Sequence, residues 1–281
     1  MSRIDLHTHS RASDGSLRPS ELVEAAAAQG VRQLGLTDHD TTDGLAEAAE
    51  SAARQGIELV TGIELTTDDG ERQADILGYF YDPEHAGLRE ILGRMREARV
   101  ERAREMVDRL RRLGAELDYA AVAELAGSGV VTRPHVAHAM VASGFVLDVD
   151  EAFRRYIARG RPAFVDRYRL TPPAACELIR AAGGVPVLAH PVPNGNPYSD
   201  PLRLRSFLLG LVEAGLGGLE CYYWRYTRRV NRWLEALAWH HRLVPSGGSD
   251  YHGPWRANRL GAVEVPEGTV ERLRAAAEAG R

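Results

Sequence analysis

Short apolar runs alternate with longer amphipathic stretches over the first eighty residues of the chain. Four runs rich in isoleucine, leucine and valine are typical of parallel strands, which are buried on both faces. They span residues 3–6, 33–37, 58–65 and 74–80. Two stretches between them, residues 20–30 and 43–56, carry apolar side chains at helical spacing and end at glycine, which commonly terminates a helix. The pattern predicts strands joined by crossover helices.

The same alternation returns in the last part of the chain. Strands are predicted at residues 185–189, 218–222 and 244–246, and helices at residues 172–182, 202–214 and 227–240. Seven strands connected by helices favour an α/β fold whose sheet closes, or nearly closes, into a barrel.

The segment between these two regions has a different pattern. Helices are predicted at residues 88–113, 120–126, 134–143 and 148–159, and the next strand-like run comes only at residues 162–165. We therefore expect two domains: a barrel built from residues 1–87 and 164–281, and a helical insertion, or cap, at residues 88–163. Barrel enzymes carry specificity in such connecting segments.

Composition and charge exclude some functions. With 44% hydrophobic residues, the 281-residue chain can bury one large core or a core and a small second domain. A net charge of −4 gives no overall field that would hold nucleic acid, so an anionic substrate needs a local basic pocket. Cys176 and Cys221 lack the spacing of a metal or redox motif. No apolar run is long enough to span a membrane, and we expect a cytoplasmic protein without an obligate protein partner.

Acidic and histidine side chains stand at the ends of successive apolar runs, and this recurrence is the most informative feature of the sequence. The set comprises His7, His9, Asp14, His39, Glu64, Asp75, His190, Asp250 and His252. In parallel barrels the carboxyl ends of the strands form the functional face, where we expect all these side chains to meet. Imidazole and carboxylate bind divalent transition ions, and burying them without a counter-charge is costly. The sequence therefore predicts a multinuclear metal site and metal-assisted hydrolysis.

Two pairs within this set strengthen the prediction. His7 and His9 are separated by one residue, and Asp250 and His252 repeat that spacing at the other end of the chain. Side chains two positions apart on a strand project from the same face. A set without a common function would instead be scattered among strands, helices and both faces of the barrel.

Individual members of the set have other readings. Asp14 can cap the Asp-Gly turn in which it stands. Asp38 and Asp40 flank His39, and each can be a ligand or the cap of the following helix; we expect His39 to bind metal and Asp40 to cap. Glu64 follows Gly-Ile at a strand end, where a carboxylate can bridge two ions.

The motifs DLHTHSRASDG, TDHD, GIEL, AHP and GSDYH, in this order, resemble those of the polymerase and histidinol phosphatase (PHP) superfamily of metal-dependent phosphoesterases. The likeness extends over nearly the whole chain. It implies a distorted barrel of seven β/α units with two or three divalent ions. The implied ligands are His7, His9, Glu64 and Asp250 for one ion, Glu64, Asp75 and His190 for a second, and Asp14, His39 and His252 for a third.

Asp75 departs from the superfamily pattern, which commonly has histidine at this position. A carboxylate can still bind an ion, and it makes the site harder and more anionic, which favours Mn²⁺ or Mg²⁺ over Zn²⁺. In the alternative, Asp75 points elsewhere and the second ion binds weakly. We expect Asp75 to be a ligand and Mn²⁺ to be the bound ion, with Fe²⁺, Zn²⁺ and Mg²⁺ as the other candidates.

Within the superfamily, the helical insertion and its segment VVTRPHVAHAM resemble nucleoside 3′,5′-bisphosphate phosphatases and the related short-RNA exonucleases. This likeness implies that Arg133 and His135 reach the substrate. The guanidinium suits a phosphate, and the imidazole can contact phosphate or protonate the leaving oxygen. The alternative is an ordinary salt bridge for Arg133 and a helix-surface position for His135, which is the reading we prefer for His138.

These features together predict a metal-dependent phosphoesterase. The expected substrate is the phosphate monoester of a small nucleotide, such as a nucleoside 3′,5′-bisphosphate, with short 5′-phosphorylated RNA as a further substrate. Hydroxide bound to the ions would attack phosphorus in line. Two alternatives stay open: a phosphatase of histidinol phosphate or another small phosphomonoester, and a noncatalytic metal-binding accessory module.

Overall fold

The computed structural model describes residues 3–68, 70, 73–127, 131–192, 201–254 and 258–280, with only the backbone at residues 201–203. The chain forms two compact units. We call them the barrel unit (Met1–Arg89 and Arg169–Arg281) and the helical unit (Glu90–Tyr168). The sequence predicts the insertion at residues 88–163, and the helical unit has the bounds Glu90 and Tyr168. Among the described residues, no helix has both the length and the apolar character that a bilayer crossing requires.

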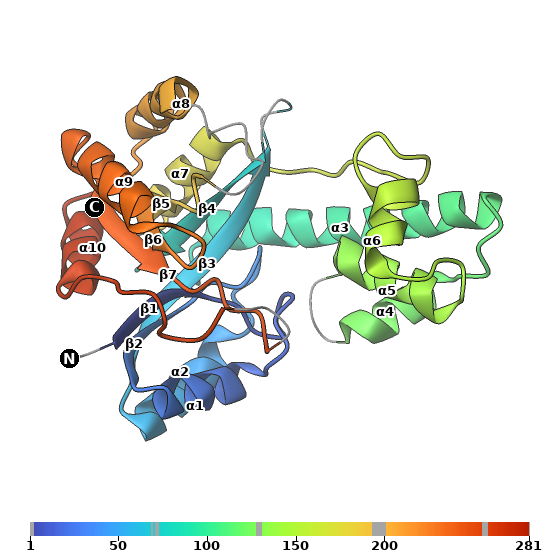
Figure 1. Ribbon diagram of the computed structural model, residues 1–281, viewed down its shortest axis with the longest axis horizontal. Helices are drawn as coiled ribbons and strands as arrows, with labels where there is room; N and C mark the ends of the chain where they lie inside the picture. Colours follow the sequence, from blue (N-terminus) through green and yellow to red (C-terminus); the bar gives the residue numbers. More distant parts are fainter. Residues whose placement is uncertain are drawn as a thin grey trace. The chain divides into compact units, whose positions relative to one another are not determined.

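Seven strands of the barrel unit form one sheet in sequence order (Figure 1). They are β1 (Arg3–Thr8), β2 (Val31–Leu36), β3 (Glu58–Asp68), β4 (Gln73–Tyr79), β5 (Val185–Leu188), β6 (Gly218–Tyr223) and β7 (Val244–Gly248). The first and last strands also meet, because Thr8 bridges Tyr251 in parallel and the His9 amide donates to the Tyr251 carbonyl at 2.9 Å. The sheet is therefore a nearly closed barrel, which confirms the predicted fold class.

The direction of the fourth strand differs from the prediction. β4 pairs antiparallel with both β3 and β5, whereas the sequence pattern led us to expect a parallel strand. Only four residues separate the end of β3 at Asp68 from the start of β4 at Gln73, and a parallel connection needs a crossover of a dozen or more. A link this short can only return the chain beside the strand it has just left.

The direction of β4 changes how Asp75 reaches the functional face. Asp75 lies near the amino end of its strand, and Glu64 lies within β3, four residues before its end at Asp68. The expectation that all nine residues lie at or just beyond carboxyl ends is therefore wrong for these two. Because β4 is antiparallel, its amino end lies beside the carboxyl end of β3, and Asp75 pairs with Thr66. The residue therefore arrives at the expected edge from the opposite direction.

Helices surround the sheet of the barrel unit. They are α1 (Pro19–Ala28), α2 (Leu45–Gln55), α7 (Pro172–Ala181), α8 (Pro201–Glu213), α9 (Arg228–His240) and α10 (Thr269–Glu278). The first five match the predicted helices closely, and α2 ends at Gly56, whose φ of 65° is a left-handed conformation that suits glycine. The sequence pattern did not predict α10. Its Val270, Leu273 and Ala277 pack into the core beneath the strands.

Among the described residues, two apolar clusters contribute to the core of the barrel unit. One joins apolar side chains of β1, β3, β4 and β5 to α10, and includes Leu6, Leu77 and Tyr79. The other packs the neighbouring helices α1 and α2 against β2 through residues such as Leu22 and Leu34 (Figure 1). Burying the helices against the sheet fixes the strands, and with them the loops that follow the strand ends.

The helical unit has its own apolar core. Its elements are most of α3 (Ala86–Arg112), α4 (Tyr119–Ala126), α5 (Arg133–Ala142), α6 (Val149–Ala152) and the π-helical turn η1 (Phe153–Ile157). Met106, Leu110, Val136 and Met140 are fully or almost fully buried in this core. The predicted helix at 148–159 is therefore α6 continued by η1, and the strand-like run at 162–165 forms no strand. Its Ala163 packs into the helical core instead.

Candidate metal centre

All nine side chains of the predicted set come together in the barrel unit. They form three groups in each of which one potential ligand atom per residue lies within 4.8 Å of the others. The groups are His7, His9, Glu64 and Asp250; Glu64, Asp75 and His190; and His9, Asp14, His39 and His252. The grouping follows the expected ligand sets and adds His9 to the third. Ligation itself stays a prediction.

Glu64 on β3 is the centre of the arrangement. Its Oε2 lies 3.2 Å from His7 Nε2, 3.1 Å from His9 Nε2 and 3.3 Å from His39 Nδ1. Its Oε1 lies 3.1 Å from His190 Nε2. One buried carboxylate thus faces four imidazoles delivered by three different segments, which is the geometry of a bridging ligand.

Asp250 completes the first group from the loop after β7. Its Oδ1 lies 3.5 Å from His7 Nε2 and 3.3 Å from His9 Nε2. Its backbone has a φ of 51°, a region that non-glycine residues seldom adopt. A strained backbone at such a position is held by its surroundings and commonly marks a functional site.

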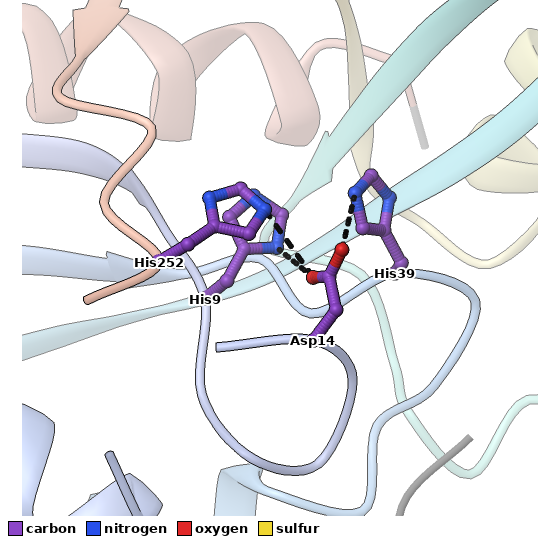
Figure 2. Close-up of side chains that lie close together, drawn as sticks. All are labelled: His9, Asp14, His39 and His252. Atoms are coloured by element: carbon purple, nitrogen blue, oxygen red, sulfur yellow. Dashed lines mark ion pairs between the residues drawn. The ribbon is translucent and has the colours of Figure 1, made fainter. Parts of the chain in front are cut away.

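The third group surrounds the carboxylate of Asp14. Oδ1 lies 3.2 Å from His252 Nε2 and 3.9 Å from His9 Nδ1, and Oδ2 lies 4.0 Å from His39 Nε2. Figure 2 shows the three imidazoles directed at this carboxylate from different parts of the chain. The rings of His9 and His252 are stacked with their centroids 4.0 Å apart. Asp14 is therefore placed to share an ion with three histidines.

Asp75 and His190 extend the site on the other side of Glu64. His190 Nε2 lies 3.8 Å from Asp75 Oδ2, and Asp75 Oδ1 is buried without a hydrogen bond among the described residues. Burial, with the neighbouring Glu64 carboxylate, raises the pKa of Asp75 to about 6. A buried carboxylate oxygen that lacks a donor fits a position where a cation binds.

His9 is a second buried residue of the centre whose polar atoms lack hydrogen bonds among the described residues. Neither of its ring nitrogens makes a hydrogen bond within the described part of the chain, although Nε2 lies 3.1 Å from a carboxylate oxygen of Glu64. The two groups are close but not aligned as donor and acceptor. Close ligand atoms that point at a common position rather than at each other suit a shared divalent ion.

The carboxylates of the centre raise the pKa values of its histidines His9 and His190. Burial lowers the pKa of His9, but Asp250 and Glu64 outweigh it and raise the pKa to about 10. Burial is likewise outweighed at His190, where Glu64 and Asp75 raise the pKa to about 9. The metal-free site therefore attracts protons, and divalent ions would take their place.

Asp38 and Asp40 belong to none of the three groups, and their carboxylates accept hydrogen bonds from neighbouring segments of the site. Asp38 Oδ1 accepts hydrogen bonds from the Ser10 amide and the Ser13 hydroxyl, both at 2.7 Å, and so anchors the loop that carries Asp14. Asp40 was expected to cap the next helix, but α2 begins after Gly44. Asp40 Oδ1 instead accepts from the Thr66 amide at 2.8 Å, because its segment runs beside β3.

The two remaining candidates lie in the helical unit, at the start of α5. The Arg133 guanidinium lies 5.7 Å from the centroid of the Phe153 ring. His135 is the third residue of the helix, and its Nδ1 accepts a hydrogen bond from the Thr132 amide at 3.1 Å. Both residues therefore have structural contacts, and a role in substrate binding stays a prediction. His138 is exposed on the helix surface.

Sequence reasoning missed two residues of β6. Glu220 and Tyr223 contribute no ligand to the three groups, yet both contact residues that do. A signal was present in the motif GLECYY, because an acid within an otherwise apolar strand must find a buried partner.

With this geometry established, the chain can be compared with known proteins. The sequence profile of the PHP domain matches residues 5–128. The chain is 36% identical over 267 residues to a 3′,5′-nucleoside bisphosphate phosphatase of Chromobacterium violaceum, an alignment covering 92% of this chain and 90% of the relative. It is 38% identical over 253 residues to a 5′-3′ exoribonuclease of Haemophilus influenzae, with 90% of both chains covered. The chain belongs to the PHP family.

A solved structure extends the comparison to three dimensions. It is named as a candidate metal-dependent phosphoesterase from Bifidobacterium adolescentis, and it matches with a TM-score of 0.85 at 29% identity, covering 98% of this chain and 96% of that one. The resemblance drawn from the motifs is thus confirmed. This PHP protein is a metal-dependent phosphoesterase, and its clustered imidazoles and carboxylates are the groups suited to hold the ions.

Proposed function

We propose that this protein is a phosphatase of small nucleotides that carry two phosphates, of the nucleoside 3′,5′-bisphosphate type. The observation that carries the proposal is the set of three overlapping ligand groups joined through Glu64 and His9. The same function is named for the C. violaceum relative, which aligns over nine-tenths of both chains.

In this proposal the nine residues hold two or three divalent ions. His7, His9, Glu64 and Asp250 would hold one; Glu64, Asp75 and His190 a second; and Asp14, His39 and His252, with His9 beside them, a third. Bound ions of this kind activate water and neutralise the charge that develops on the phosphoryl oxygens. We propose Mn²⁺ as the ion, because Asp75 adds a hard oxygen ligand to imidazoles that Fe²⁺ and Zn²⁺ also accept.

The exposure of the ligands indicates the direction from which the substrate approaches. The side chains of His39 and His190 are each 20% exposed, whereas those of His7 and His9 are fully buried. A phosphate ester therefore reaches the centre from the side of His39, Asp75 and His190. The deeper residues anchor the ions and exclude water from beneath them.

Selection of the substrate is assigned to the helical unit. Arg133 would bind the phosphate that is not cleaved, since a guanidinium matches phosphate oxygens with a planar fork of donors. His135 would contact the same phosphate or supply a proton to the leaving oxygen. Trimming of short 5′-phosphorylated RNA is proposed as a related activity, in line with the name of the H. influenzae relative. Location in the cytoplasm stays a prediction.

The proposal is tested by measuring phosphate release from a panel of substrates with the Mn²⁺-loaded protein. The panel holds a nucleoside 3′,5′-bisphosphate, a short 5′-phosphorylated RNA, histidinol phosphate and an aryl phosphate. We expect the bisphosphate to have the highest kcat/KM, and the variant Glu64→Gln to be inactive on all four. Preference for histidinol phosphate would replace the nucleotide assignment, and turnover by Glu64→Gln equal to wild type would refute the metal centre.

A further inference from the structure

Strand β6 supplies no ligand to the three groups but contacts members of two of them. The whole strand is buried, and its pairing with β7 shifts register between Glu220 and Tyr222. Glu220 lies opposite Ser246 and Tyr222 opposite Gly247, so β6 carries one extra residue at this point. In a regular strand, side chains at positions 220 and 223 would point to opposite faces. The bulge re-aims the later one, and both side chains reach the metal centre.

Glu220 makes two hydrogen-bonded contacts with the centre. Its Oε1 lies 2.9 Å from His7 Nδ1, and its Oε2 accepts from the backbone amide of His190 at 2.6 Å. The Glu220 carboxylate is completely buried. An ionised carboxylate only accepts hydrogen bonds, so the partner nitrogen of His7 must carry a proton. That arrangement directs His7 Nε2, the other nitrogen, towards Glu64 and Asp250.

The second contact of Glu220 holds the backbone of His190. His190 has a φ of 25°, an unusual value for a residue other than glycine, and it stands directly before Pro191. A backbone of this kind persists only where its surroundings hold it. The hydrogen bond from the His190 amide to Glu220 does so at the residue whose ring faces Glu64 and Asp75.

Tyr223 makes a comparable contact with the loop after β7. Its hydroxyl donates to Asp250 Oδ2 at 2.8 Å, and the other carboxylate oxygen, Oδ1, faces His7 and His9. The hydrogen bond thus decides which oxygen of Asp250 is turned to the ligand group.

We propose that Glu220 is a positioning residue that orients His7 and His190 for metal binding, and that Tyr223 does the same for Asp250. The inference rests on the metal centre of the proposed function. Partners of this type fix the tautomer and direction of a metal-binding imidazole, and their loss typically lowers metal affinity or activity about 10- to 100-fold. β6 is then the strand that aligns ligands from β1, β5 and the loop after β7.

The test is a calorimetric titration of the metal-free protein with Mn²⁺, read together with elemental analysis at saturation. Glu220→Gln keeps the size of the side chain but cannot accept from both donors at once. We expect its Mn²⁺ dissociation constants to rise about 10- to 100-fold while the number of ions bound at saturation stays that of wild type. Its kcat with Mn²⁺ at saturation should also fall.

Cys221→Ala is the matched control, because Cys221 is buried on the same strand and belongs to none of the three ligand groups. It should lower the melting temperature without changing Mn²⁺ affinity. Tyr223→Phe removes one hydroxyl and should weaken Mn²⁺ binding roughly 2- to 10-fold, and it serves as the test if Glu220→Gln does not fold.

The outcomes separate this inference from the proposed function. Wild-type protein that binds no Mn²⁺ would refute the metal centre itself. If wild type binds Mn²⁺ and Glu220→Gln binds it with the same affinity, the positioning role is refuted. Tyr223→Phe takes the place of Glu220→Gln in this comparison if the first variant does not fold. If Glu220→Gln bound one ion fewer than wild type even at saturating Mn²⁺, Glu220 would be a ligand. That result would also refute the positioning role.

Discussion

The histidines of the metal centre in the barrel unit and three arginines of the helical unit have different partners. In the barrel unit, imidazoles converge on the buried carboxylate of Glu64 and the half-buried carboxylate of Asp14. In the helical unit, guanidinium groups lie over aromatic rings: Arg94 over Tyr168 at 3.9 Å, Arg104 over Tyr119 at 4.7 Å and Arg133 over Phe153 at 5.7 Å. Stacking uses the face of a guanidinium, whereas its donors lie at the edge. The first arrangement suits a metal ion and the second suits an anion, so chemistry and selection should be separable by mutation.

The largest effect is expected when a ligand at the centre of the barrel unit is removed. His9→Ala takes an imidazole from two ligand groups and should abolish activity, by about a thousandfold or more, together with loss of bound Mn²⁺. His138→Ala in the helical unit is the control and should match wild type in both respects, because His138 is an exposed helix residue. Full metal content in His9→Ala, measured by elemental analysis, would show that the ligand assignment is wrong.

A change in the helical unit should affect selection and spare the metal. Losing a charge-assisted contact with phosphate costs about 2–4 kcal/mol, so Arg133→Ala should lower kcat/KM for a nucleoside 3′,5′-bisphosphate roughly thirtyfold to a thousandfold. An aryl phosphate, which has one phosphate, should suffer less, and Mn²⁺ content should not change. Arg104→Ala removes another stacked arginine of the same unit and should leave the preference unaltered. Equal losses on both substrates would assign Arg133 to the common chemistry.

The protonation of the imidazoles gives a pH dependence to metal binding. The metal-free site holds protons on His190 and His9, whose pKa values are raised to about 9 and about 10. Below these pKa values an ion must displace the protons. As the pH rises, the Mn²⁺ dissociation constant should therefore fall about tenfold per pH unit for each proton released. Calorimetry between pH 6 and 8, in buffers of different ionisation enthalpy, counts those protons. Constant affinity without proton release would contradict the expectation.

The smallest expected effect concerns Asp75. Asp75→Asn removes the negative charge of one ligand and should weaken one ion by about tenfold or somewhat more while the others bind normally. Asp75→His should be tolerated and should shift preference towards Zn²⁺, because imidazole is a softer ligand than carboxylate. The measurement is metal stoichiometry and competition between Mn²⁺ and Zn²⁺. An unchanged stoichiometry and kcat in Asp75→Asn would make Asp75 a bystander.

Much of this centre could be predicted because its ligands interrupt apolar runs. His7 and Glu64 lie within strands rich in isoleucine, leucine and valine, where a polar side chain is conspicuous in the sequence. Helix ends were equally visible, since Gly56 and Thr227 stand at the expected boundaries of α2 and α9. Local periodicity is enough for such features.

The errors concern information that periodicity does not contain. The apolar pattern of β4 reports that the strand is buried but not its direction, which depends on the length of the link to β3. Residues 162–165 are apolar enough for a strand, but Ala163 is used by the helical core. Glu220 became interpretable only once His7 and His190, 213 and 30 positions away in the sequence, were seen beside it.

The antiparallel pairing of β3 and β4 also limits how this protein can evolve. Side chains alternate between the two faces of a strand, so a slip of one position in the hairpin would turn Asp75 away and bring Ala74 into its place. A single-residue deletion in β4 directly after Asp75 would have this effect even though every ligand codon stayed intact. The other strands are joined by longer connections that can absorb added residues. Tolerance of insertions and deletions should therefore be lowest in the shortest connection of the barrel, and a scan of such changes would map it.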